Sequence, residues 1–162
     1  MNSIIINVAV IAVIGLLATV ALQGAQPGVT PGATPKSTGQ AIAGRYDVSA
    51  DGATVRDLTT GLTWQRVCPQ TSVSMVGAEA YCAGLNLGGT GWHLPTRAQL
   101  LGIVDVAYRP SIHPLAFPGA PDWVFWTGSS ASTPSTGFAI SFADGRLSEV
   151  DRGELHNVRC VK

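Results

Sequence analysis

The sequence is 162 residues long, which is enough for one ordinary domain with an appendage and too short for two full domains. Ten Lys and Arg residues balance ten Asp and Glu residues, and the basic side chains are spread singly along the chain. A neutral chain without a basic run has no electrostatic footprint for nucleic acid, so nucleic-acid binding is excluded as a function. Apolar residues make up 46% of the chain and charged residues 12%, an imbalance that comes largely from the N-terminal end.

Residues 4–22, IIINVAVIAVIGLLATVAL, form a nearly continuous apolar segment. Such a segment is typical either of a signal peptide, here within residues 1–25, or of an uncleaved membrane anchor, since about 20 apolar residues span a bilayer. Small residues at Ala21 or Ala25 would suit cleavage, whereas the preceding MNS has no Lys or Arg. Both alternatives stay open, and both predict an extracytoplasmic protein that is secreted or anchored at the cell surface.

Residues 26–44, QPGVTPGATPKSTGQAIAG, are rich in Pro, Gly and Thr and carry one charged residue, Lys36. This composition predicts an extended linker. Its glycines do not recur at every third position, which excludes a collagen triple helix. The predicted organisation is therefore an export or anchor segment at 1–25, a linker at 26–44 and a folded domain at 45–162.

Short strands are predicted at the start of the folded part. Residues 46–48 and 54–55 flank the hairpin-type turn signal Asp51-Gly52. Residues 62–67, LTWQRV, read as a further strand.

Two helices are predicted next, each with a capping residue. Ser74 can cap a helix that runs to about residue 85 and buries a stripe. The members of that stripe are Met75, Ala78, Cys82 and Leu85.

The stretch GWHLPTRAQL, residues 91–100, predicts a strand-to-helix junction. Pro95 favours extended backbone before it, and Thr96 with Gln99 matches the reciprocal capping pattern at a helix start. His93 alternates with two apolar neighbours, Trp92 and Leu94, which favours a structural role for it over a catalytic one. The residues of this second helix that we expect to face the core are Leu100, Leu101 and Val104.

A long loop punctuated by prolines, residues 111–122, leads into WVFWT. Trp123 and Trp126 cannot both face one side of a regular strand, because side chains alternate along it, so one is predicted in the core and the other exposed. Residues 137–150 predict a hairpin with its turn at residues 143–146. Residues 156–161, HNVRCV, predict a final strand.

The three cysteines allow any one of three disulfide pairings in an exported domain. Their spacing lacks the close pairs that zinc sites use. No GxSxG, HExxH, phosphate-binding glycine loop or EF-hand spacing occurs, so the sequence predicts a protein without enzymatic activity and without a resident cofactor.

Seven short motifs follow one another over residues 45–162: VRDLTTGLTWQR, AEAYCAGLNLGG, GWHLPTRAQLLGIVD, AFPG, WTGS, FADGR and VRCV. The ordered set resembles the bacterial domain family known as DUF1566, or the Lcl C-terminal domain, a branch of the C-type lectin-like fold. The resemblance implies an α+β domain with two helices, short antiparallel strands, pairing terminal strands and long irregular loops. It also implies a disulfide between Cys82 and Cys160, with Cys68 left over. The calcium-binding triplets of sugar-binding C-type lectins and the catalytic cysteines of the related sulfatase-modifying enzymes are not matched.

These observations predict a ligand-binding surface domain, adhesin-like or lectin-like, that recognises a glycan or a protein. Aromatic planes stack on sugars or anchor protein contacts, and Arg supplies directed hydrogen bonds. The candidate ligand-binding residues are Asp122, Trp123, Trp126, Arg146 and His156.

Two alternatives and one ion accompany this hypothesis. Small residues recur at spacing three in the apolar segment, Ala9, Ala12, Gly15 and Ala18, and would let it pack with its own copies in a homo-oligomeric surface assembly or filament. A sulfatase-modifying type of enzyme is the third reading. Calcium is the candidate ion, with three carboxylates near one hairpin as its ligands: Glu149, Asp151 and Glu154.

Overall fold

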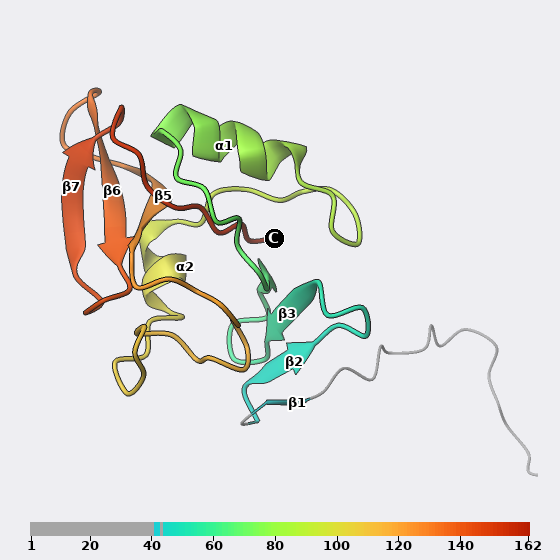
Figure 1. Ribbon diagram of the computed structural model, residues 1–162. Helices are drawn as coiled ribbons and strands as arrows, with labels where there is room; N and C mark the ends of the chain where they lie inside the picture. The colour runs from blue at the N-terminus through green and yellow to red at the C-terminus, as the bar shows by residue number, and fades with distance from the viewer. Residues whose placement is uncertain (1–40, 43) are drawn as a thin grey trace, which may run out of the picture. The chain divides into compact units, whose positions relative to one another are not determined.

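The computed structural model describes residues 41–42 and 44–162, which belong to one compact unit (Figure 1). The predictions for the apolar segment and for most of the linker lie outside these described residues. The fold is α+β, with two small antiparallel sheets and two helices. The elements in chain order are β1 (Ala41–Ile42), β2 (Tyr46–Val48), β3 (Thr54–Asp57), β4 (Thr63–Gln65), α1 (Met75–Gly84), α2 (Arg97–Leu101), β5 (Val124–Ser130), β6 (Thr136–Ser141) and β7 (Leu147–Asp151).

The first sheet has the order β1-β2-β3-β4. The predicted hairpin joins β2 to β3, with Val48 opposite Val55 and Gly52 at a φ of +70°, a backbone conformation that glycine adopts without strain. Strand β1 was not predicted. It lies in the range expected to be linker and pairs with β2, so the sheet begins before Arg45.

The second sheet has the order β5-β6-β7 and contains the predicted C-terminal hairpin. Its turn places Gly145 at a φ of +79°, where a Cβ would lie 2.8 Å from Val104 Cγ1. Glycine is therefore required there both by the turn and by the close approach of the loop after α2.

Both helices begin where the capping residues predict. Ser74 accepts a hydrogen bond from the Gly77 backbone N–H at the start of α1, and Thr96 and Gln99 form the reciprocal capping box at the start of α2. Helix α2 is shorter than expected, because it ends at Leu101, with Gly102 as its C-terminal cap. The prediction that Leu101 faces the core is consequently wrong: its side chain is 38% exposed, and Ile103, just beyond the helix, is buried instead.

The C-terminal segment is not the continuous strand predicted for residues 156–161. It forms isolated bridges with four different segments, through the pairs Val73 with His156, Phe125 with Asn157, Trp64 with Val161 and His93 with Val161. In Figure 1 it runs from β7 back toward the first sheet. The segment changes partners every few residues, so it cannot maintain the ladder that defines a strand.

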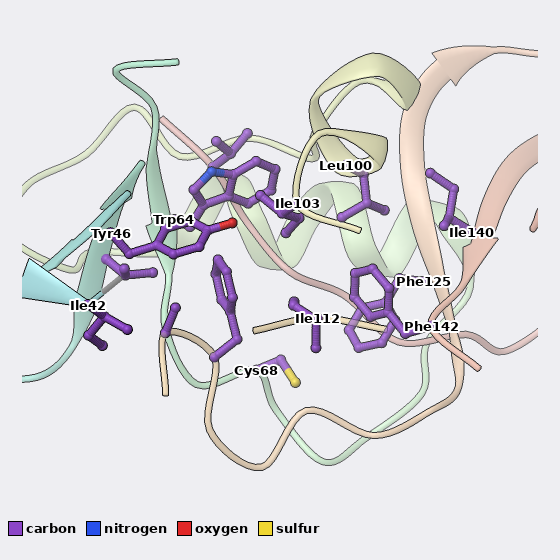
Figure 2. Close-up of a cluster of buried hydrophobic side chains, with 14 of the residues drawn as sticks. Ile42, Tyr46, Trp64, Cys68, Leu100, Ile103, Ile112, Phe125, Ile140 and Phe142 are labelled. Atoms are coloured by element: carbon purple, nitrogen blue, oxygen red, sulfur yellow. The ribbon is translucent and has the colours of Figure 1, made fainter. Parts of the chain in front are cut away.

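The buried side chains form two clusters. The first lies between the two sheets and contains Trp64, Phe125 and Phe142 (Figure 2). The ring centres of the two phenylalanines are 4.7 Å apart. The second gathers around the disulfide between Cys82 on α1 and Cys160, the pair that the resemblance implies. The remaining cysteine, Cys68, is buried and unpaired in the first cluster.

None of the helices in residues 41–42 and 44–162 combines the length and the apolar character needed to cross a bilayer.

Candidate functional site

A hollow of about 500 Å³ opens beside Trp123, at the point where the long loop enters β5. We call it the Trp123 hollow. It brings together three of the five residues predicted to bind a ligand, Asp122, Trp123 and His156. Its other lining residues are Ser72, Val124, Leu155 and Asn157.

The two tryptophans of WVFWT have opposite environments, as their spacing predicts. Trp123 is 52% exposed, and its backbone carbonyl accepts a hydrogen bond of 2.9 Å from Phe142, which fixes the main chain beside the sheet. Trp126 is fully buried, and its indole N–H donates to the Val73 carbonyl at 2.8 Å. Trp126 is therefore corrected from a ligand contact to a core residue, because neither face of its ring is open.

His156 connects this core residue to the hollow. Two backbone hydrogen bonds of 2.8 and 3.0 Å join it to Val73, and its ring packs at 4.8 Å against the Trp126 indole. Its Nε2 lies 3.3 Å from a carboxylate oxygen of Glu154. The imidazole is thus held as the floor of the hollow, with a small part of its side chain open to solvent.

Asn157 contributes a buried polar group to the same floor. Its backbone pairs with β5, donating to the Val124 carbonyl at 2.9 Å and accepting from Trp126 at 3.0 Å. The side-chain oxygen Oδ1 is buried and has no hydrogen-bond partner among the described residues. Asn157 thus belongs to the packed floor of the hollow through its backbone pairing.

The lining of the Trp123 hollow combines apolar and polar groups that can bind a ligand. An exposed indole and the Leu155 side chain, which is 65% exposed, supply apolar contact. The Asp122 carboxylate, the Ser72 hydroxyl and the imidazole supply polar contacts around it. This pairing of an aromatic plane with hydrogen-bonding groups is typical of sites that hold sugars or peptides.

Arg146 lies outside this site. It follows the β6–β7 turn, and its carbonyl accepts from Ser141, whereas Trp123 bonds to Phe142 from the opposite side of β6. One strand therefore separates Arg146 from the Trp123 hollow. Arg146 therefore does not line this hollow, and its role in ligand binding stays a prediction.

The three carboxylates considered for calcium bind neighbouring protein groups instead. Glu149 accepts hydrogen bonds from Ser132 and Thr136, which lower the pKa of its carboxyl group. Asp151 accepts from the Gly153 backbone at 2.7 Å, and Glu154 accepts from the Asp151 backbone at 3.2 Å. Within residues 41–42 and 44–162, no three His, Cys, Asp or Glu side chains gather as metal ligands.

Sequence reasoning missed Ser72, Leu155 and Asn157. They come from the loop before α1 and from the C-terminal segment, which meet only through the backbone pairing of Val73 with His156. No local pattern marks such a long-range contact. An exposed Leu between Glu154 and His156 was the one available signal, because a large apolar residue among polar ones can indicate an interaction surface.

The model of the Lcl C-terminal domain family matches residues 53–162, which is more than half of the chain. The matched region contains every residue that lines the Trp123 hollow and both cysteines of the disulfide. The curated proteins contain no match to this chain.

Proposed function

We propose, from the premise that this chain belongs to the Lcl C-terminal domain family, that it is an extracytoplasmic domain that binds a glycan through the Trp123 hollow. Membership of this family supports a surface-associated domain, and the family is not a known enzyme family. The observation that carries the proposal is the half-exposed indole of Trp123 beside the Asp122 carboxylate and the Ser72 hydroxyl, in a hollow whose floor is fixed by the packing of His156 against Trp126.

As a ligand of this hollow, a glycan is a better fit than the flat surface of a partner protein. Sugar rings present an apolar face that stacks on an indole and hydroxyl groups that bind carboxylates and amides. The Asp122 carboxylate and the Ser72 hydroxyl that line the hollow can bind such sugar hydroxyls.

For the fold, we propose the C-type lectin-like architecture. It is supported by the two helices, the small antiparallel sheets, the long loop before β5 and the disulfide from α1 to the C-terminal segment. The C-terminal segment also pairs with the first sheet, since Thr63 and Lys162 exchange backbone hydrogen bonds of 2.8 and 2.9 Å.

For the domain organisation, we propose that residues 1–25 direct export or anchor the chain and that the Pro/Gly/Thr-rich segment tethers the domain. The disulfide between Cys82 and Cys160 supports an oxidising compartment outside the cytoplasm.

The test is binding of the full-length chain to an array of glycans and sulfated polysaccharides, with calcium and again with a chelator. Trp123→Ala is expected to remove binding, whereas the control Leu115→Ala, which truncates another exposed apolar residue, is expected to keep it. Binding that disappears with the chelator would direct mutagenesis to Asp122. Binding that survives Trp123→Ala would contradict the proposed site.

Absence of any glycan binding would favour the alternative, a subunit of a surface assembly packed through residues 4–22. That alternative predicts an oligomer in mild detergent that is lost when residues 1–22 are deleted. A monomeric full-length chain would contradict it.

A further inference from the structure

A second hollow, of about 410 Å³, lies between the first turns of α1, the loop from β5 to β6 and the residue after β7. In Figure 1 the N-terminal end of α1 lies beside that loop. The second hollow shares no lining residue with the Trp123 hollow. Five of its lining residues carry hydroxyl groups, and we call it the hydroxyl hollow: Ser129, Ser130, Ser132, Thr133 and Thr136.

The loop between β5 and β6 is held by one carboxylate from β7. Glu149 accepts hydrogen bonds from the Ser132 backbone N–H at 3.0 Å, from the Ser132 hydroxyl and from the Thr136 hydroxyl. A hydroxyl that donates its proton to the protein keeps its lone pairs as acceptors. Ser132 is thereby oriented to accept a hydrogen bond from a ligand, whereas the Thr136 hydroxyl also contacts the Thr133 hydroxyl at 2.9 Å. These bonds order the loop before any ligand binds.

An ion pair at the rim supplies the complementary groups. Arg152 Nη2 lies 3.3 Å from Glu79 Oε1, and both side chains are more than a third exposed. The Arg152 backbone is fixed, since it donates to the Ser135 carbonyl and accepts from Met75. This single contact uses one N–H of the guanidinium and one carboxylate oxygen, so both partners retain hydrogen-bonding capacity toward the hollow.

We propose that the hydroxyl hollow binds a neutral hexose unit. A sugar hydroxyl beside this ion pair can accept from a free N–H of Arg152 and donate to the second carboxylate oxygen of Glu79, and a neighbouring sugar hydroxyl can donate to Ser132. The two carboxylates, Glu79 and Glu149, outnumber the one guanidinium, so the local charge disfavours anionic sugars. The volume lies within the range of about 300–1,000 Å³ that is typical of small-molecule sites.

The probes are the methyl glycosides of galactose, glucose and mannose, with glucuronate as the anionic counterpart. They are titrated to about 50 mM into the full-length chain while backbone amide NMR shifts are followed, since a single sugar with few contacts binds weakly. At least one neutral hexose is expected to shift the amides of residues 129–133. Glucuronate is expected to bind more weakly than that hexose.

Three variants locate the effect. Arg152→Gln is expected to raise the Kd of the hexose about tenfold, because charge-assisted hydrogen bonds are lost. Glu79→Gln is expected to weaken hexose binding and to strengthen glucuronate binding, because Arg152 loses its counter-charge. The matched control Arg146→Gln removes an exposed guanidinium outside both hollows and is expected to change neither.

The site is independent of the proposed function, so the two can fail separately. Trp123→Ala is expected to remove binding on the glycan array and to leave the hexose shifts unchanged. The proposal is overturned if no neutral hexose shifts residues 129–133, if glucuronate binds the wild-type chain as well as the hexose does, or if the shifts appear only around Trp123.

Discussion

The two hydrophobic clusters meet along the C-terminal segment, and they hold it in different ways. Val158 and Cys160 face the disulfide cluster, whereas Arg159 and Val161 face the cluster between the sheets. The first face is closed by a covalent bond to α1. The second face is held by the buried guanidinium of Arg159. One short segment is thus anchored covalently on one face and by polar contacts on the other.

The guanidinium of Arg159 is fully buried and forms no ion pair with a carboxylate in residues 41–42 and 44–162. Its Nη1 donates to the Gln65 and Arg66 carbonyls at 2.6 and 2.7 Å, and its carbon lies 4.8 Å from the centre of the Phe117 ring. Burial lowers the pKa of Arg159 to about 10. These contacts give two backbone carbonyls a hydrogen-bond donor and place the cation over an aromatic ring. They compensate only part of the free-energy cost of burying a charge.

The comparison predicts that the covalent anchor contributes more stability than the polar one. In the double variant Cys82→Ala/Cys160→Ala, the free energy of unfolding is expected to fall by about 4 kcal/mol, since the bond closes a long loop in the unfolded chain. Urea denaturation of both proteins measures the difference. Cys68→Ala is the control for loss of a buried cysteine that forms no bridge, and an equal loss there would contradict the comparison.

The next effect is at the polar anchor. Arg159→Met keeps a long side chain against Phe117 but leaves two buried carbonyls without their donor, so we expect a loss of about 2–3 kcal/mol. Arg159→Lys keeps the charge but lacks the planar guanidinium, so its free energy of unfolding should lie between those of the wild type and Arg159→Met. A Met variant as stable as the wild type would mean that desolvation of the guanidinium cancels its hydrogen bonds.

The ion pair between Arg45 and Asp57 lies near the edge of the cluster between the sheets. Burial alone would raise the pKa of Asp57. The bidentate contact with Arg45, at 3.2 and 2.8 Å, and the hydrogen bond from the Thr59 backbone lower it by more, so the pKa of Asp57 lies below its usual 3.8. Asp57→Asn is expected to reduce stability by about 1–2 kcal/mol near neutral pH.

The pH dependence gives this prediction a sign. A carboxylate with a lowered folded pKa contributes stability in full above its unfolded pKa and loses it as pH falls through the folded value. The difference between wild type and Asp57→Asn should therefore be constant near neutrality and shrink below about pH 4. Thermal unfolding across that range measures it, and a difference that grows on acidification would contradict the ion-pair explanation.

Local features of this fold could be predicted from the sequence because they depend on near neighbours. Ser74, Thr96 and Gln99 specify two helix starts, and Asp51-Gly52 and Gly145 specify two turns. The buried positions of α1 followed from its helical period.

Features that depend on distant segments could not be predicted. The stripe expected for α2 failed at Leu101, because the helix ends at that residue and the chain then turns to bury Ile103 instead. The spacing of Trp123 and Trp126 predicted that their environments differ, but it did not say which one is buried. That choice depends on the Val73 carbonyl, 53 residues before Trp126, which accepts the Trp126 indole N–H. The floor of the Trp123 hollow depends on the same encounter of Val73 with His156.

The smallest expected change in stability is at Trp123, which lies outside both clusters. Because half of its side chain is already exposed and its backbone makes the contact with Phe142, Trp123→Ala should alter the free energy of unfolding by less than about 0.5 kcal/mol. Trp126→Ala, three residues away, should cost about 3–5 kcal/mol because it opens a cavity beneath His156. If Trp123→Ala removes glycan binding without loss of stability, whereas Trp126→Ala weakens both, then the exposed indole makes the contact and the buried one positions the floor. Equal losses of stability in the two variants would mean that Trp123 belongs to the core and that the hollow is not a binding surface.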